Sequence, residues 1–272
     1  MKVYENTAGT LEVDHVKRTS NYNMKEHMHD KYELYCLMAG ERDYFIRERT
    51  YRMEQGDFVF IEKGEPHRAI DTAVPNHERA VFYFTSSILD GLPIRGHSGV
   101  VRLSPQVRYK GEALVRELLS EAKVEAKGRD VMLELLLKQL LLLVFRAQEE
   151  QPESEDRLSP AHQMMSEVAA YIRSHYQEPL LLKEVAEQFF VSRYYLSRTF
   201  KQCTGFGFSE YVQLVRMREA QRLLIETDLK IIEVAEQTGI RPAANFYTLF
   251  KRMNGCSPLQ YRKRQRALLT SH

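Results

Sequence analysis

Two stretches of the chain repeat one pattern of apolar and polar positions. They read LLKEVAEQFFVSRYYLSRTFKQCTGFGFSEY over residues 181–211 and KIIEVAEQTGIRPAANFYTLFKRMNGCSPLQY over 230–261, so that EVAEQ, FK, Gly and Tyr recur after 49 or 50 residues. A fixed period of this kind is typical of a duplicated supersecondary unit. The apolar spacing in each copy predicts a short helix, a tight turn and a second helix, and therefore two helix-turn-helix modules.

The turn of each predicted module depends on one residue. Gly239 stands where the backbone must be left-handed, a conformation that glycine adopts at little cost. Phe190 occupies that position in the first copy, so we expect its turn to be built differently or to be strained. The residues expected to face inward from the short helices are Val185, Ala186, Val234 and Ala235.

The second helix of the first copy is expected to have two contrasting faces. Ser192 is predicted to cap its N-terminus. The residues predicted to form a buried stripe are Tyr195, Leu196, Thr199 and Phe200. The opposite, basic stripe consists of Arg193, Tyr194, Ser197, Arg198 and Lys201. Such a face can hydrogen-bond base edges in a DNA major groove. The alternative, a merely solvated helix face, loses weight because the unit occurs twice.

Helical spacing continues between the modules over residues 208–226, bounded by Gly207 and by Thr227 with Asp228. A helix of roughly 18 residues spans about 27 Å. That length is close to the roughly 34 Å between successive major grooves on one DNA face. We therefore expect one subunit to place two reading helices in adjacent grooves and to bend the duplex somewhat.

At these residues the chain resembles the AraC/XylS family of bacterial transcription regulators. The resemblance covers about residues 161–266 and includes KRMNGCSPLQYRKR, which is similar to the family signature of a basic residue, Gly, Ser/Thr-Pro and Tyr-Arg. It implies that the first module contacts bases through Tyr194, Ser197 and Arg198. It implies a matching face on the second module made of Arg241, Ala243, Ala244, Tyr247 and Thr248. Ser192 and Lys251 complete the predicted DNA-binding set.

The second face departs from the family pattern, because two alanines and a threonine stand where long polar side chains are frequent. We therefore expect most base readout from the first module, although methyl groups can still contact a thymine methyl.

The net charge also differs between the two halves of the chain. Residues 161–272 hold 16 Lys and Arg against 10 Asp and Glu, a net of +6, whereas the remainder holds 23 against 27, a net of −4. The basic half can supply the sequence-independent part of DNA binding.

Residues from about 11 to 90 show short alternating runs, namely ELYCLMAG, RDYFIRERTYRM, GDFVFIEKGEPHRA and AVFYFTS. Short strands separated by turn residues indicate an antiparallel barrel or sandwich. With 272 residues and 43% hydrophobic composition, the chain has the length for two packed domains. The predicted fold class is α+β multidomain: a jelly-roll β-barrel with helices, then an all-α domain.

A second motif lies within these strands and resembles the two-part cupin motif over about residues 25–70. It reads His27-x-His29-x3-Glu33-x6-Gly40 and Gly56-x5-Glu62-x-Gly64-x2-His67, with Glu62 where proline is usual. His27, His29 and Glu33 share one face of a strand, and His67 is expected to close the set from a neighbouring hairpin. The four side chains are predicted to line an effector site inside the barrel.

Three interpretations of this set stay open. Three histidines and a carboxylate suit a divalent transition metal such as zinc, nickel or iron. The same side chains can instead hydrogen-bond a sugar or another polar metabolite, with no cofactor required. They can also be a purely structural set.

The stretch 130–149 is apolar around nearly its whole circumference. One side of such a helix can cover the barrel while another meets a second subunit, and Leu136 and Leu140 are expected in that interface. The alternative is an ordinary buried helix between domains. We expect a sensing barrel over 1–104, a helical dimerisation segment over 105–150, a polar linker over 151–160 and the DNA-binding domain over 161–272.

Three scattered cysteines and the absence of an apolar leader or spanning segment indicate a soluble protein of the reducing cytoplasm that does not enter a membrane. Together with the resemblance, these features predict a homodimeric transcription regulator, more often an activator in this family. Its partners would be double-stranded promoter or operator DNA, a small effector and RNA polymerase. One alternative is a cupin metalloenzyme, an isomerase or dioxygenase with accessory DNA binding. Another is a constitutive DNA-binding protein whose barrel only dimerises.

Overall fold

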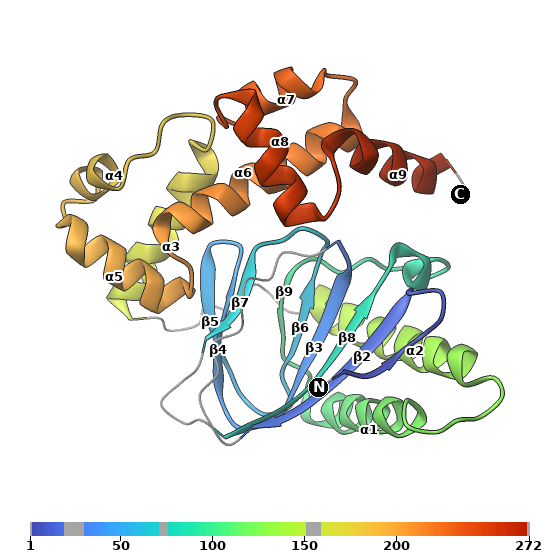
Figure 1. Cartoon of the computed structure of the whole chain (residues 1–272). Helices are drawn as coiled ribbons and strands as arrows, with labels where there is room; N and C mark the ends of the chain where they lie inside the picture. The colour runs from blue at the N-terminus through green and yellow to red at the C-terminus, as the bar shows by residue number, and fades with distance from the viewer. Residues whose placement is uncertain (1, 19–29, 71–75, 151–158, 271–272) are drawn as a thin grey trace. The chain divides into compact units, whose positions relative to one another are not determined.

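The computed structural model describes residues 2–18, 30–70, 76–150 and 159–270. The chain divides into two compact parts, Met1–Leu158 and Ser159–His272, which we call the β unit and the helical unit. Strands and two α-helices form the first, and helices form the second (Figure 1). The predicted fold class is thereby confirmed.

Within the described residues, the β unit forms two antiparallel sheets that face each other. The strands are β1 (Lys2–Glu5), β2 (Leu11–Arg18), β3 (Tyr32–Ala39), β4 (Arg42–Ile46), β5 (Arg49–Met53), β6 (Phe58–Ile61), β7 (His67–Ile70), β8 (His77–Phe84) and β9 (Gly99–Val101), with a short 3-10 helix η1 (Ser86–Leu89). The larger sheet has the order β1-β2-β8-β3-β6-β9 and the smaller one β5-β4-β7. Tyr35 and Val81 of the larger sheet share a buried cluster with Tyr44 and Ala69 of the smaller one. The two sheets therefore enclose an interior.

Alternation along the strands sends neighbouring side chains to opposite faces of the larger sheet. On β3, Tyr35 and Leu37 belong to the interior cluster, whereas Leu34 and Cys36 belong to the cluster formed with the helices. Because both faces of this sheet are covered, β6 is buried and apolar at all four of its positions.

Two helices, α1 (Pro105–Glu121) and α2 (Arg129–Glu150), cover the outer face of the larger sheet (Figure 1). The apolar residues that α2 buries within its own unit are Leu133, Leu136, Leu137, Leu140, Leu141, Val144 and Phe145. Leu136 is 8% exposed and Leu140 is 0% exposed, so the expectation that these two leucines meet a second subunit is wrong. The sheet of the same chain already covers them. The exposed apolar side chains of α2 are instead Val131, Met132 and Leu135.

The helical unit consists of α3 (Pro160–Ser174), α4 (Leu182–Gln188), α5 (Arg193–Thr204), α6 (Phe208–Glu226), α7 (Ile231–Gln237), α8 (Ala243–Asn254) and α9 (Pro258–Thr270). The pairs α4–α5 and α7–α8 are the two predicted helix-turn-helix modules, and α6 joins them (Figure 1). Buried as predicted are Val185, Ala186, Val234 and Ala235. No helix in the described ranges has both the length and the apolar character to cross a membrane.

The two turns share one backbone conformation although their sequences differ. Gly239 has a φ of +70°, and Phe190 has a φ of 56°. A side chain in this region costs about 1–2 kcal/mol relative to glycine, so the first turn is strained as expected. Phe190 is 96% exposed, and its ring therefore has room. There is no such room for a side chain at Gly239, because a Cβ there would lie 2.6 Å from the carbonyl oxygen of Gln177.

Candidate DNA-reading helices and β-unit interior

The first predicted reading helix, α5, begins as its sequence suggests. The hydroxyl of Ser192 accepts a hydrogen bond from the backbone N–H of Tyr195 at 3.1 Å, which caps the helix. Leu196, Thr199 and Phe200 are buried, whereas Tyr195 is 41% exposed and only partly joins that stripe. The whole predicted DNA-reading face is exposed: Arg193, Tyr194, Ser197, Arg198 and Lys201. Their contact with DNA stays a prediction.

The second predicted reading helix, α8, is held from behind by Phe246 and Phe250, both fully buried. The predicted residues that stand exposed on it or just before it are Arg241, Ala244, Tyr247, Thr248 and Lys251, while Ala243 is half-buried. The hydroxyl of Thr248 donates back to the carbonyl oxygen of Ala244 at 3.2 Å. The exposed surface of α8 therefore presents fewer long polar groups than that of α5.

The segment that matches the family signature closes the end of the connecting helix. Arg262 of α9 donates through Nε to the carbonyl oxygen of Leu224 at 3.0 Å and through a terminal nitrogen to that of Leu229 at 2.6 Å. Arg266, one turn later, donates to carbonyl oxygens of the same region. The last carbonyl groups of a helix lack partners within it. The two arginines supply partners and so fix α9 against α6.

Inside the β unit, a buried polar group spans the two sheets. Glu33 on β3 is 0% exposed and His67 on β7 is 1% exposed. His67 Nε2 lies 3.2 Å from a Glu33 carboxylate oxygen, and the Tyr44 hydroxyl donates to the other oxygen at 3.0 Å. Burial disfavours the charged form of His67, but the charge and hydrogen bond of Glu33 outweigh it and raise the pKa of His67. Two of the four predicted effector residues thus meet, from opposite sheets.

Sequence reasoning missed the aromatic residues around this group. Tyr35 is fully buried, its ring lies 5.2 Å from that of Tyr44, and the Arg79 guanidinium stands 5.7 Å from its centroid. The Tyr35 hydroxyl has no hydrogen-bond partner within the described part of the chain, and burial raises its pKa. Alternation was the available signal, because Tyr35 follows Glu33 by two positions on β3.

The other two predicted effector residues, His27 and His29, lie outside the described residues. Among the residues that are described, no group of three or more His, Cys, Asp or Glu side chains is arranged to hold a metal ion. Of the four predicted ligands only Glu33 and His67 are described, so the predicted metal site stays a prediction. Zinc, nickel or iron retained in stoichiometric amount through dialysis would be the evidence for that site.

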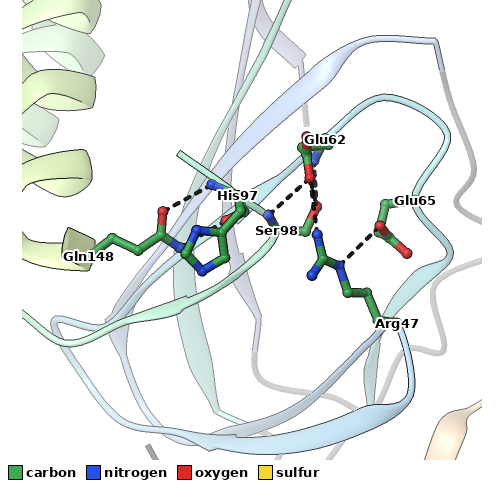
Figure 2. A network of polar contacts seen from close by, with 6 residues as sticks. All are labelled: Arg47, Glu62, Glu65, His97, Ser98 and Gln148. Atoms are coloured by element: carbon green, nitrogen blue, oxygen red, sulfur yellow. Dashed lines mark hydrogen bonds and ion pairs between the residues drawn. The ribbon is translucent and has the colours of Figure 1, made fainter. Parts of the chain in front are cut away.

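A second polar network begins at Glu65, next to His67, and ends on α2; Figure 2 shows it from Glu65 and Arg47 to Gln148. His67 Nδ1 donates to the carbonyl oxygen of Glu65 at 2.7 Å. Arg47 bridges the carboxylates of Glu65 at 3.2 Å and Glu62 at 3.1 Å. The Glu62 N–H donates to the Ser98 hydroxyl at 2.8 Å. Glu62, noted in the sequence as a departure from the cupin pattern, therefore ties the hairpin to the segment before β9.

The last step of the network joins the segment before β9 to α2. The amide of Gln148 accepts from the His97 N–H at 3.0 Å and donates to the His97 carbonyl oxygen at 2.8 Å. Gln148 lies in the last turn of α2. Figure 2 shows its side chain reaching from the helix toward His97, with Ser98 and Glu62 beyond. A chain of bonded groups thus connects the interior of the β unit to the end of α2.

The two helix-turn-helix modules and the polar interior define a DNA-binding protein with a separate β-rich part suited to a small ligand. A family model described as an AraC-like ligand binding domain matches residues 15–158, and one described as a helix-turn-helix domain matches residues 185–264. The first match alone spans more than half of the 272 residues. The chain belongs to the AraC family of transcription regulators.

Proteins similar over both units carry regulator names. The HTH-type transcriptional activator RhaR of Klebsiella pneumoniae is 27% identical, over 89% of this chain and 88% of RhaR. The uncharacterized HTH-type transcriptional regulator YfiF of Bacillus subtilis is 27% identical, over 90% of this chain and 80% of YfiF. A solved structure, the C-terminal domain of the response regulator AraT from Geobacillus stearothermophilus, is 40% identical over 40% of this chain and 88% of that domain, with a TM-score of 0.37.

Proposed function

We propose that this protein is a sequence-specific transcription regulator whose DNA binding responds to a small polar effector held inside the β unit. The duplicated helix-turn-helix modules carry the proposal, because each presents an exposed face on a helix that is held from behind by buried side chains. The buried Glu33, His67 and Tyr44 group supports the effector site. The similar proteins are named as transcriptional regulators, so the metalloenzyme alternative has no support.

The finer features of the proposal follow from the family and from exposed surfaces. We propose a cytoplasmic homodimer that binds promoter DNA and activates RNA polymerase there, as the activator names of similar proteins suggest. The exposed apolar part of α2, which consists of Val131, Met132 and Leu135, supports a subunit contact. The protein would exist in two arrangements that differ in how they bind DNA. The effector shifts the balance between these arrangements only through its different affinity for them.

The polar network that ends at Gln148 can transmit effector binding from the interior of the β unit to α2. An effector that contacts Glu33 or Tyr44 also acts on His67, because all three are bonded together. From His67, bonded groups lead through Glu65 and Arg47 to Gln148 in the last turn of α2. The chain then continues into residues 151–158 and the helical unit. A protein that shows no effector-dependent thermal shift would favour the constitutive alternative.

Replacing Arg198 with alanine is expected to relax the base preference at one position of the binding site. A bidentate arginine–guanine contact contributes about 1–3 kcal/mol of discrimination, whereas methyl contacts contribute less. Lys201→Ala is the matched control, since loss of a phosphate contact should weaken all sequences about equally. Binding of each variant to a randomised duplex library measures both effects.

If Tyr247→Ala or Thr248→Ala removes more sequence information than Arg198→Ala, the second module is the principal reader. A wild-type chain that selects no sequence would overturn the proposed function.

Replacing Tyr35 with phenylalanine is expected to stabilise the effector-free protein and to weaken its effector response. The buried Tyr35 hydroxyl has no partner among the described residues. Such a group costs about 1–3 kcal/mol, so its removal should raise the free energy of unfolding by about 1 kcal/mol. Tyr44→Phe is the control and should destabilise the protein, because the Tyr44 hydroxyl donates to Glu33.

Urea unfolding measures the stability change, and thermal shift with a panel of sugars and other polar metabolites measures the effector response. A Tyr35→Phe protein that responds to the same compound as strongly as the wild type would remove this hydroxyl from the effector site.

A further inference from the structure

A cavity of about 400 Å³ lies in the helical unit between α6 and the α7–α8 module. Its polar lining comes from Gln213 and Arg216 of α6, from Arg241 in the turn, and from Asn245, Thr248 and Arg252 of α8. Three of these side chains are guanidinium groups, and no carboxylate belongs to the lining. We call this cavity the arginine pocket. Its chemistry is that of an anion site.

The three arginines bring their charge to the pocket without a compensating acid. Arg216 donates through Nε to the carbonyl oxygen of Tyr176 at 2.8 Å and through a terminal nitrogen to that of Glu178 at 2.7 Å. Burial lowers the pKa of Arg216, but a guanidinium stays charged at neutral pH. Arg241 and Arg252 are exposed, and in the described part of the chain neither guanidinium makes an ion pair.

The wall of the pocket that contains Gly239 and Arg216 is held by close packing and hydrogen bonds. Gly239, which lines it, lies so near the connection between α3 and α4 that a Cβ would stand 2.6 Å from the Gln177 carbonyl oxygen. Arg216 is bonded to the same connection on either side of Gln177. A binding site whose walls are already ordered loses less entropy when the ligand binds.

The pocket adjoins the exposed face of the second reading helix. Asn245, Thr248 and Arg252 follow one another along one stripe of α8, beside the stripe of Ala244, Tyr247 and Lys251. A helix whose neighbouring stripe faces DNA bases places such a flank near the sugar-phosphate backbone. Planar guanidinium groups bind phosphate oxygens in pairs, which suits them to this position.

We infer that the arginine pocket binds a phosphate group. Arg241, expected from the sequence to read bases, then holds phosphate together with Arg216 and Arg252. The inference rests on the proposed function where the phosphate is a DNA phosphodiester, and stands without it where the phosphate is free. In the first case the pocket anchors the second module, whose own base-reading face is poor in polar groups, onto the duplex.

The test compares two double variants of the full-length chain on a random-sequence duplex. Arg241→Gln with Arg252→Gln removes two charges from the pocket, and Lys263→Gln with Arg264→Gln removes two exposed charges from α9 outside it. The pocket variant should bind about tenfold more weakly. It should also lower the slope of log affinity against log salt by about 1, whereas the α9 variant should change the slope less.

Thermal unfolding of both variants checks that they are folded, and Arg252→Lys keeps the charge while removing the paired geometry of an exposed guanidinium. Arg252→Lys should weaken binding without lowering the salt slope. If wild-type protein binds the duplex and the two double variants lose the same affinity and slope, the phosphate pocket is refuted while the proposed function stands. A wild-type chain that binds no duplex refutes the proposed function instead.

The two sources of phosphate are separated with neutral backbone analogues and with inorganic phosphate. In a duplex selected by the wild type, a single methylphosphonate facing the pocket should weaken wild-type binding about tenfold and leave the pocket variant unaffected. Calorimetric titration of the DNA-free chain with inorganic phosphate tests whether the pocket binds free phosphate. Saturable binding that is lost in the pocket variant would show that it does. Failure of both measurements overturns the inference.

Discussion

Replacing Gly239 with alanine is expected to destabilise the helical unit by about 2–5 kcal/mol and to abolish DNA binding by the second module. Two effects add here. The backbone φ of +70° disfavours any side chain, and the new Cβ would lie 2.6 Å from the Gln177 carbonyl oxygen and 3.0 Å from that of Tyr176. Backbone atoms cannot move aside as a flexible side chain can. The free energy of unfolding in urea measures the loss.

Gly255 provides a matched control for this substitution. It has a φ of +69° and caps α8, but a Cβ there would meet nothing within 4 Å. Gly255→Ala should therefore cost only the conformational part, about 1–2 kcal/mol. Phe190→Gly is the reverse experiment and should be neutral or slightly stabilising, because it relieves the strained first turn. Equal losses for the two alanine variants would show that the close approach at Gly239 does not matter.

Replacing Leu136 and Leu140 with glutamate is expected to unfold the β unit. Both side chains are buried against the larger sheet, and two buried carboxylates without partners should cost more than about 4 kcal/mol. Val131→Glu with Leu135→Glu places the same charges on the same helix, where the side chains are 63% and 58% exposed. This exposed pair should change stability by only about 0.5 kcal/mol and should dissociate the proposed dimer.

Light scattering reports the oligomeric state of each variant, and urea unfolding reports its stability. The proposed contact through α2 predicts a folded monomer for the exposed pair alone. A folded dimer carrying Val131→Glu and Leu135→Glu would place the subunit contact elsewhere on the β unit. A stable, folded protein carrying the two buried substitutions would contradict the packing of α2 on its own sheet.

Local signals explain why the helical unit was the easier half to predict. The N-cap of Ser192 and the left-handed turn at Gly239 depend on neighbours a few residues away, so the pattern around them is sufficient. Tyr195 was the exception, because helical spacing places it near the buried stripe but does not say how far the neighbouring helix extends over it. The role of Arg262, which closes the end of α6, required contacts between residues almost forty positions apart.

The β unit was harder to predict because strands from distant parts of the chain build its interior. Alternation on β3 identified the face that holds Glu33, and the cupin-like motif identified His67. Alternation also placed Tyr35 on that face, but nothing in either pattern indicated that Tyr44 and Arg79 would join it, since those two residues come from other strands, one in each sheet. Glu62 stood out in the sequence, but its link through Arg47 and Ser98 became visible only in the folded structure.

The sequence by itself determined the two helix-turn-helix modules, the α+β fold class and the basic character of the second half, because periodicity, capping and charge are local properties. The tertiary structure alone decided which leucines of α2 are buried, since an apolar helix surface can pack on its own sheet or on a partner with the same pattern. It likewise decided that Arg216, Arg241 and Arg252 line one pocket. Residues of α6, of the turn before α8 and of α8 itself meet there, where Gly239 and Arg216 both lie against the connection between α3 and α4.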